Sequence, residues 1–454
     1  MAGCGGGDGD VAAANPERSA RSDVPFKGCD EVACTGEIEG AAYEIQLPER
    51  WNGTLLLYSH GYRFAEPSPP DFEPVSTSPA PAANAEVATA LLAEGYALAG
   101  SAFATNGWAV QDGVTAGEQL HKFFADNVEK PDRVYVWGDS LGGLITQMLA
   151  EKNPDWVAGA APLCGVLGGT NLNLDLALDV AYAVKALIYP DLKLTGFASN
   201  DEAVRNWQGA FDAISAAGGD TTNGVPKILM VAALVDAPTQ TRTYDGSTIE
   251  SQVRARAESI LTAMGYGTYG RYEIEQRVGG NPSANDTTDY STRVSEEELS
   301  LINSVSPGSA ERLLRALANG ERVTADDAAR TSADELGNPT GALTDPTLAI
   351  HTTADPLVLA QNETVFADRV HAERATPLLS QAFIGPPETY SQDPGAPYGA
   401  GHCNFSVDQR VTFIEILDDW ARRGIYPTPV TFETELGEAH ANVFDPGPWP
   451  AEER

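Results

Sequence analysis

Short apolar runs alternate with helical stretches in two separate parts of the chain, before residue 167 and after residue 345. An edge strand is predicted over 42–47, and buried strands over 54–59, 96–103, 133–137, 157–163, 347–353 and 378–384. Strands that are apolar on both sides and separated by helices form a parallel sheet that is covered on both faces. The sequence therefore predicts an α/β fold with a doubly wound, mostly parallel sheet. Within it, Thr115-x-x-Glu118 is a capping-box pattern and predicts the start of a helix.

The alternation stops between Gly168 and Thr344. In this segment the best helical candidates are 176–188, 202–217, 251–264 and 295–318, whereas 228–235 fits a strand or a buried helix equally well. So long an interruption is too ordered to be one loop. We expect an inserted, mainly helical cap domain over 168–344. The other boundaries are a flexible tether over 1–25, the first part of the sheet domain over 26–167, and its second part with a C-terminal tail over 345–454.

One motif carries chemistry. Gly138-x-Ser140-x-Gly142 follows the strand predicted over 133–137 and precedes a helical stretch. A strand-to-helix turn this tight leaves no room for side chains at the glycine positions, and it strains the serine backbone so that the hydroxyl stands clear of the sheet. The pattern is typical of a nucleophile elbow. An ordinary Gly-rich turn is the alternative.

With this motif the chain resembles the α/β-hydrolase family of serine hydrolases, over about residues 41–165 and 347–424. In that family the catalytic acid follows a later strand and the histidine follows the last one. The resemblance implies a catalytic triad of Ser140, Asp355 and His402. Asp355 ends the strand over 347–353, and His402 lies in a Gly-rich loop before the last helix.

Two of these positions have rivals. Asp236 also follows an apolar run and fits the acid position if the cap ends earlier, but we prefer Asp355 because His402 follows it by one αβ unit. Only His402 lies in a Gly-rich loop at the expected place. The other histidines fall in a turn, on helices, inside a strand or in the tail: His60, His121, His371, His351 and His440.

The turn Ser59-His60-Gly61-Tyr62 resembles the His-Gly-x turn of the family. This implies that the backbone N–H groups of Tyr62 and Leu141 stabilise an oxyanion. By the same resemblance, His60 braces the turn, and it is grouped with Tyr62 and Trp108 as a substrate-site residue. Trp108 suits substrate stacking and core packing equally well.

The triad implies acyl transfer to water through an acyl-Ser140 intermediate. His-Gly-Tyr and the Asp355-Pro356 turn resemble secreted esterases and cutinase-like polyester hydrolases, so we expect hydrolysis of carboxylic esters, with aromatic esters and polyesters included. His402-Cys403 is similar to the tannase and feruloyl-esterase group, although Asp139 stands where that group has a cysteine. A secreted serine aminopeptidase is the alternative, and an inactive binding protein is a third hypothesis.

The charge balance limits the partners. The chain has 29 Lys and Arg against 64 Asp and Glu, which gives a net charge of −35. Because nucleic acids and anionic membranes are also negatively charged, we do not expect this chain to bind either of them. The longest apolar run, 228–235, is too short to span a membrane. We expect a small-molecule or polymeric ester as the substrate, with no cofactor and no metal, and we assign no oligomeric state.

The five cysteines bear on the cellular location of the protein and on its disulfide bonds. Ala2-Gly3-Cys4 resembles the end of a bacterial lipoprotein signal, which implies a lipid anchor at Cys4 and a secreted or cell-surface protein of the bacterial envelope. The alternative is an accidental cysteine in a Gly-rich leader. Cys29 and Cys34 are close enough in sequence for a local disulfide, and in the family's fold Cys164 and Cys403 border the active site and form a second one. Buried free thiols are the other interpretation of these four residues.

Overall fold

A computed structural model describes residues 29, 33–390, 397–436 and 444–450. The tether predicted over 1–25, Cys4 and His440 lie outside these residues.

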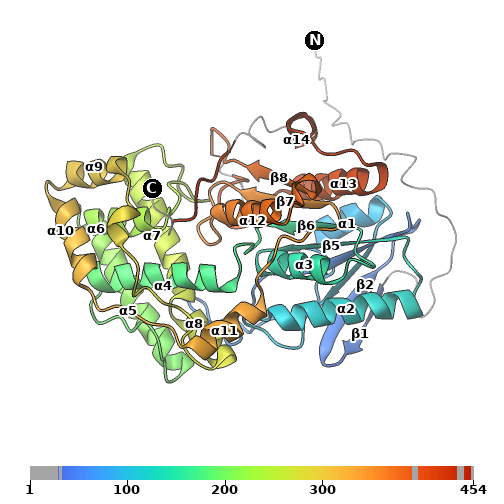
Figure 1. Cartoon of the computed structure of the whole chain (residues 1–454), viewed down its shortest axis with the longest axis horizontal. Helices are drawn as coiled ribbons and strands as arrows, with labels where there is room; N and C mark the ends of the chain where they lie inside the picture. Colours follow the sequence, from blue (N-terminus) through green and yellow to red (C-terminus); the bar gives the residue numbers. More distant parts are fainter. Residues whose placement is uncertain (1–28, 30–32, 391–396, 437–443, 451–454) are drawn as a thin grey trace, which may run out of the picture.

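An eight-stranded sheet forms the centre of the described chain (Figure 1). Its strand order is β1-β2-β4-β3-β5-β6-β7-β8, with β3 to β8 parallel and with β1 and β2 antiparallel at one edge. This confirms the mostly parallel sheet. The strands are β1 (Ala33–Ile38), β2 (Ala41–Gln46), β3 (Thr54–Ser59), β4 (Ala97–Ser101), β5 (Arg133–Asp139), β6 (Gly159–Leu163), β7 (Thr347–Thr352) and β8 (Leu379–Ile384).

Helices cover both faces of the sheet because successive strand side chains point to opposite sides. On β3, Leu55 and Leu57 pack with α2 (Val110–Asn127) and α3 (Leu141–Lys152). Leu56 packs on the other face, with α1 (Ala85–Ala93) and α13 (Val407–Arg423), and α14 (Pro429–Leu436) lies beside α13. On β7, Ala349 packs with α12 (Gln361–Ala372). The doubly wound arrangement is thus confirmed.

The predicted start of α2 is wrong. The helix begins at Val110, and Thr115 and Glu118 lie inside it. Close packing on α3 explains the difference: a Cβ at Gly113 would lie 2.5 Å from the Ile145 side chain. The turn of α2 that precedes Thr115 therefore packs on α3, and the helix begins without a side-chain cap.

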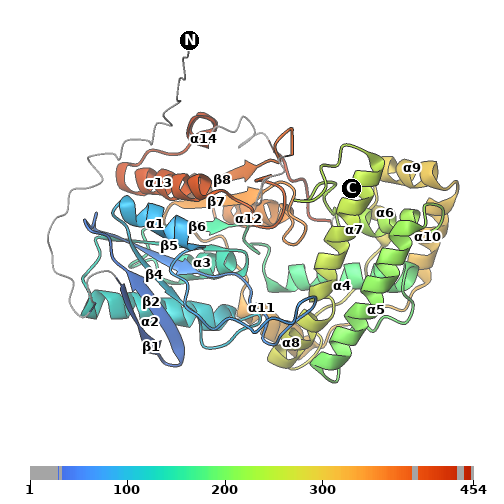
Figure 2. The ribbon, with the colours of Figure 1, turned by 180° about the vertical axis from the view of Figure 1, so that it is seen from behind.

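The chain between β6 and β7 is helical and lies beside the sheet (Figures 1 and 2). Its helices are α4 (Thr170–Leu187), α5 (Asn200–Gly219), α6 (Gly224–Leu234), α7 (Ile249–Tyr266), α8 (Tyr269–Val278), α9 (Glu296–Val305), α10 (Ser309–Asn319) and α11 (Asp327–Leu336). We call residues 168–344 the helical segment. It has an apolar core of its own, which includes Leu178, Met230 and Ile260. Among the described helices, none is both long enough and apolar enough to cross a membrane.

Three local outcomes differ from or complete the sequence prediction. The ambiguous run 228–235 is largely helix, as part of α6. The single helix expected over 295–318 is two, α9 and α10, because Pro307 and Gly308 interrupt it. Helix α8 was not predicted, since it buries charged Arg271 and Glu275 and so lacks an apolar stripe.

Candidate active site

Ser140 lies in the tight turn between β5 and α3. Its backbone angles, φ 60° and ψ −123°, are a strained combination for a residue with a side chain. The flanking glycines are required because a Cβ at Gly138 or Gly142 would lie 2.3 or 2.0 Å from the carbonyl oxygen of Ser59, at the end of β3. The turn therefore has the geometry that the motif predicts.

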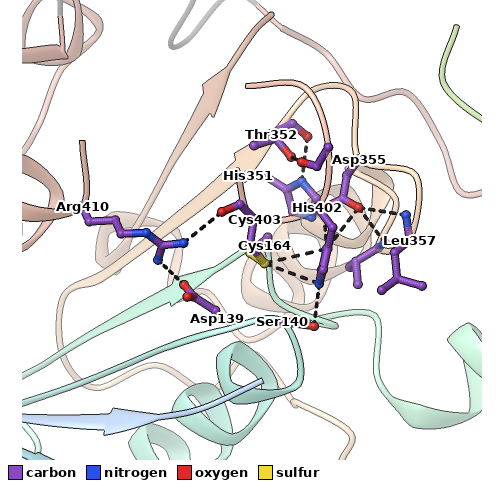
Figure 3. Close-up of a disulfide and its surroundings, with 12 residues drawn as sticks. Asp139, Ser140, Cys164, His351, Thr352, Asp355, Leu357, His402, Cys403 and Arg410 are labelled. Atoms are coloured by element: carbon purple, nitrogen blue, oxygen red, sulfur yellow. Dashed lines mark hydrogen bonds and ion pairs between the residues drawn. A yellow bond between two sulfur atoms is a disulfide. The ribbon is translucent and has the colours of Figure 1, made fainter. Parts of the chain in front are cut away.

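Three segments that are far apart in sequence bring Ser140, His402 and Asp355 into contact (Figure 3). Ser140 Oγ lies 2.8 Å from His402 Nε2, and His402 Nδ1 lies 2.8 Å from Asp355 Oδ2. Ser140 follows β5, Asp355 follows β7, and His402 lies between β8 and α13. All three therefore sit at the carboxyl ends of parallel strands, where the loops of such a sheet meet.

Asp355 is oriented by its own loop. Its Oδ1 accepts backbone hydrogen bonds from Leu357 and Val358, each 2.9 Å long, and its side chain is fully buried. The remaining oxygen is thus directed at His402. This arrangement fixes the imidazole so that Nδ1 carries a proton and Nε2 accepts the proton of the Ser140 hydroxyl.

The pKa values of this pair move in opposite directions. Burial alone would raise the pKa of Asp355, but the charge of His402 and its hydrogen bond outweigh burial and lower it. Burial alone would lower the pKa of His402, but Asp355, through charge and hydrogen bond, raises it above the ordinary value. The two groups therefore stabilise each other's charged forms.

The rival acid, Asp236, is not the hydrogen-bond partner of His402. It follows α6 in a backbone conformation with φ 48°, and its Oδ2 accepts a hydrogen bond from Gln361 at 3.2 Å. His402 is bonded to Asp355 instead.

His60 lies behind the turn that follows β3. Its ring stacks on Phe103 with centroids 4.0 Å apart, and its Nδ1 lies 2.7 Å from the carbonyl oxygen of Gly61. Burial, assisted by Arg63, lowers the pKa of His60 to about 4, so the ring is neutral near pH 7. His60 is not among the described residues that line the cavity at Ser140, and its contacts are those of a brace for the turn.

The two residues predicted to donate to an oxyanion flank Ser140. Tyr62 and Leu141 line the same cavity as the serine. Leu141 is the first residue of α3, where a backbone N–H has no acceptor within the helix and the helix dipole favours negative charge. The turn that carries Tyr62 approaches closely, since a Cβ at Gly61 would lie 3.3 Å from that of Ser140.

A cavity of about 800 Å³, its opening to solvent included, lies over Ser140. The helical segment supplies one wall, from α4, α7 and the end of α6. Tyr62, Trp108, Val166, the start of α3 and the loop after Asp355 supply the other walls. Its described lining contains no charged side chain. Lining residues that the sequence did not indicate are Val166, Asn173, Leu174, Leu176, Ala177, Val180, Val235, Ala237, Ser259, Ile260, Ala263, Tyr266, Leu357, Val358 and Leu359.

Trp108 combines its two predicted roles. It lines the cavity, yet only 5% of it is exposed, and its Nε1 donates to Thr170 Oγ1 at 3.0 Å. Its backbone N–H donates to Glu273 on α8 at 3.0 Å. Trp108 therefore joins the helical segment to the sheet domain within the cavity wall.

Both expected disulfides are present, Cys29–Cys34 and Cys164–Cys403. The second lies beside the serine and histidine (Figure 3), with Cys403 Sγ 3.5 Å from His402 Nε2. The two sulfur atoms and a ring nitrogen lie within 4.8 Å of one another. As a disulfide, however, the cysteines offer no thiolate to a metal ion.

No protein-family model matches the chain. It is 32% identical over 140 residues to the o-phthalyl amidase of Xanthobacter agilis, a match that covers 29% of this chain and 27% of the relative. The matched part thus spans about a quarter of the length of that curated relative.

Solved structures that resemble the chain include feruloyl esterase B from Aspergillus oryzae, with 15% identity, a TM-score of 0.38, and coverage of 87% of this chain and 80% of the other. Proline iminopeptidase from Mycobacterium smegmatis has 13% identity, a TM-score of 0.36, and coverage of 86% and 98%. Est1E from Butyrivibrio proteoclasticus has 11% identity, a TM-score of 0.35, and coverage of 87% and 99%.

Proposed function

We propose that the protein is a serine hydrolase that cleaves carboxylic esters through an acyl-Ser140 intermediate. The observation that carries this proposal is the pair of 2.8 Å contacts that link Ser140 to His402 and His402 to Asp355, at the floor of a cavity. A serine with this partner is activated as a nucleophile because the imidazole takes its proton during attack.

The steps follow from the geometry. His402 Nε2 accepts the hydroxyl proton while Ser140 Oγ bonds to the carbonyl carbon, and Asp355 stabilises the imidazolium that forms. The backbone N–H groups of Tyr62 and Leu141 stabilise the negative oxygen. His402 then gives its proton to the departing alcohol oxygen. A water molecule repeats the sequence on the acyl-enzyme and releases the acid.

The uncharged lining of the cavity favours a substrate with a neutral, apolar acyl group. A charged group placed there would lose its hydration without a described partner of opposite charge, which costs several kcal/mol. Tyr62, Trp108 and Tyr266 supply aromatic walls that suit a ring as well as an alkyl chain. In this proposal the helical segment is an inserted cap, since α4 and α7 roof the serine and limit the size of the substrate.

Amide hydrolysis with the same kind of acyl group is a second candidate. It is favoured by the likeness to an enzyme named o-phthalyl amidase. The aminopeptidase alternative requires a carboxylate that binds a free amino group. The described residues of the cavity lining include no such carboxylate.

The location is also part of the proposal. Two disulfides are typical of an oxidising compartment, so we place the protein outside the cytoplasm, as a secreted or cell-surface enzyme.

Turnover of matched substrates tests the proposal. p-Nitrophenyl benzoate and acetate, benzoyl-p-nitroanilide and an aminoacyl-p-nitroanilide should be compared at one pH. We expect the esters to be cleaved fastest and the aminoacyl compound to resist. A fluorophosphonate probe should label the wild type and Ser101→Ala, a control at the end of strand β4, but not Ser140→Ala. Ester turnover by a folded Ser140→Ala variant at the wild-type rate would overturn the proposal.

A further inference from the structure

Arg410 connects the two loops that carry the serine and the histidine. It lies in the first turn of α13 and is only 6% exposed. Its Nη1 donates to Asp139 Oδ1 at 2.5 Å, and its Nη2 donates to the carbonyl oxygen of Cys403 at 2.9 Å (Figure 3). Asp139 directly precedes Ser140, and Cys403 directly follows His402. One guanidinium thus contacts the residue before Ser140 and the residue after His402.

Two further contacts hold Asp139 and Arg410 in this arrangement. The second oxygen of Asp139 accepts a hydrogen bond from Tyr58 Oη at 3.1 Å, at the end of β3. The guanidinium also lies over the ring of Phe405, 5.4 Å from its centroid. A planar fork can reach two acceptors at once, which a lysine ammonium cannot do with the same geometry. The arrangement therefore depends on arginine at this position.

We propose that Asp139 and Arg410 are positioning residues that set the separation between Ser140 Oγ and His402 Nε2. This proposal rests on the proposed function. The histidine loop is held twice at Cys403, by its sulfur to the end of β6 and by its carbonyl oxygen to Arg410. Only the second connection reaches the residue next to the nucleophile. It sets the distance across which the proton moves, and errors of about 1 Å there cost roughly 100-fold in rate.

The pair also acts on His402 through its charges. Four groups that influence the imidazole are Asp355, His351, Asp139 and Arg410. Apart from the larger effects of burial and Asp355, Asp139 raises the pKa of His402 and Arg410 lowers it. Loss of one member must therefore shift the pKa of His402 in the direction opposite to loss of the other. An ion pair distant from His402 has no such signature, and the fall in kcat is the readout of the positioning role.

The test uses Asp139→Asn, Arg410→Gln, Arg410→Lys and the double variant Asp139→Asn/Arg410→Gln in the full chain. We expect kcat for an ester to fall at least about tenfold in each, with KM changed less than about twofold. The acid limb of the kcat/KM profile should move to lower pH in Asp139→Asn and to higher pH in Arg410→Gln. In the double variant and in Arg410→Lys it should stay near its wild-type position, while kcat remains low.

Helix α13 offers a matched control. Asp418 is 1% exposed, accepts a hydrogen bond from Tyr135 Oη and pairs with Arg422, so it repeats the Tyr-Asp-Arg arrangement away from the site. Asp418→Asn should lower stability without moving kcat or the acid limb.

Two results would overturn the positioning role. One is wild-type kcat together with an unmoved acid limb in the folded single variants. If the single variants do not fold because each leaves one buried charge unpaired, the double variant leaves none, and wild-type kcat there also rejects the role. Failure of the proposed function is a separate result, since it appears as ester turnover in Ser140→Ala or as no turnover in the wild type.

Discussion

Cys403 is bonded to Cys164, 239 residues earlier in the chain, with the two Cα atoms 5.5 Å apart. Cys164 directly follows β6, and β6 pairs with β5, the strand that leads into Ser140. The residue after His402 is therefore fixed covalently beside the strand that leads into Ser140.

Loss of this bond should slow ester turnover at temperatures at which the fold stays intact. Cys403→Ser frees the histidine loop on one side, and we expect kcat to fall about tenfold because the proton acceptor is less well placed. Closing so long a loop stabilises the fold by at most about 5 kcal/mol. Ester kcat at 25 °C and near-UV circular dichroism measure the two effects. Cys34→Ser, which breaks the other disulfide, is the control and should leave kcat unchanged; an equal loss in both variants would contradict this expectation.

Asp355→Asn and Asp236→Asn distinguish the two candidate acids. An asparagine at 355 would favour the wrong tautomer of His402, so kcat should drop by about 10⁴-fold. Asp236→Asn retains the oxygen that accepts the hydrogen bond from Gln361 and should change kcat by less than about threefold. Steady-state kinetics of the two purified variants decide between them, and an inactive Asp236→Asn beside an active Asp355→Asn would mean that the acid is misassigned.

The pH profile should report His402. The base must be neutral to accept the serine proton, so activity is lost as the pH falls through its pKa. Because Asp355 outweighs burial and raises that pKa, the acid limb of kcat/KM should lie above 6.5. Measurements from about pH 5 to about pH 9 in buffers of constant ionic strength locate it. An acid limb at or below 6.5 in the wild type would show that the imidazole is not held as the structure indicates.

The sequence was most informative where local rules act. Gly138 and Gly142 have no room for a side chain, and several strands, such as β3, are continuous apolar runs, so the serine turn and the succession of strands along the chain follow from short patterns. The positions of Asp355 and His402 came from the family resemblance, and the contacts place them together. Only the serine turn and the strands depend on few neighbours in sequence.

Features that depend on distant contacts were not accessible in the same way. Strand β1 has no apolar run because it is an exposed edge strand, and α8 buries a charged Arg271 whose partners Asn281 and Leu174 are known only from the fold. The cavity wall on α4 and α7 could not be predicted from the sequence either, because its residues resemble the buried residues of any helix. Arg410 was missed because nothing in its own segment indicates that Asp139, 271 residues earlier, lies against it.

Filling the cavity from the helical segment should change which esters are cleaved. Ile260 of α7 lines the cavity, so Ile260→Trp should lower kcat/KM for a benzoate ester at least about tenfold while an acetate ester is affected much less. Leu261→Trp is the control, because the next residue faces a different groove on the outside of the helix. Equal losses for both esters in Ile260→Trp would mean that this part of the cavity does not hold the acyl group.

Glu363 should make the fold less stable as the pH rises. It lies on α12, is 1% exposed, and its Oε2 accepts a hydrogen bond from Gln381 Nε2 on β8 at 2.7 Å. Burial raises its pKa to about 8, and the hydrogen bond opposes this only in part.

In the unfolded chain the same carboxyl titrates near about 4.3. The folded state therefore holds a proton that the unfolded state releases, so stability is greatest below about pH 4 and declines until the pH passes about 8. Because a glutamine keeps the acceptor and does not titrate, Glu363→Gln should exceed the free energy of unfolding of the wild type by only about 1 kcal/mol at pH 5, but by several kcal/mol, at most about 5, at pH 9. Urea denaturation at the two pH values measures this difference. Asp368→Asn removes the same charge from an exposed position of α12 and should show no such dependence; a gain in Glu363→Gln that is equal at both pH values would contradict the titration of a buried carboxyl.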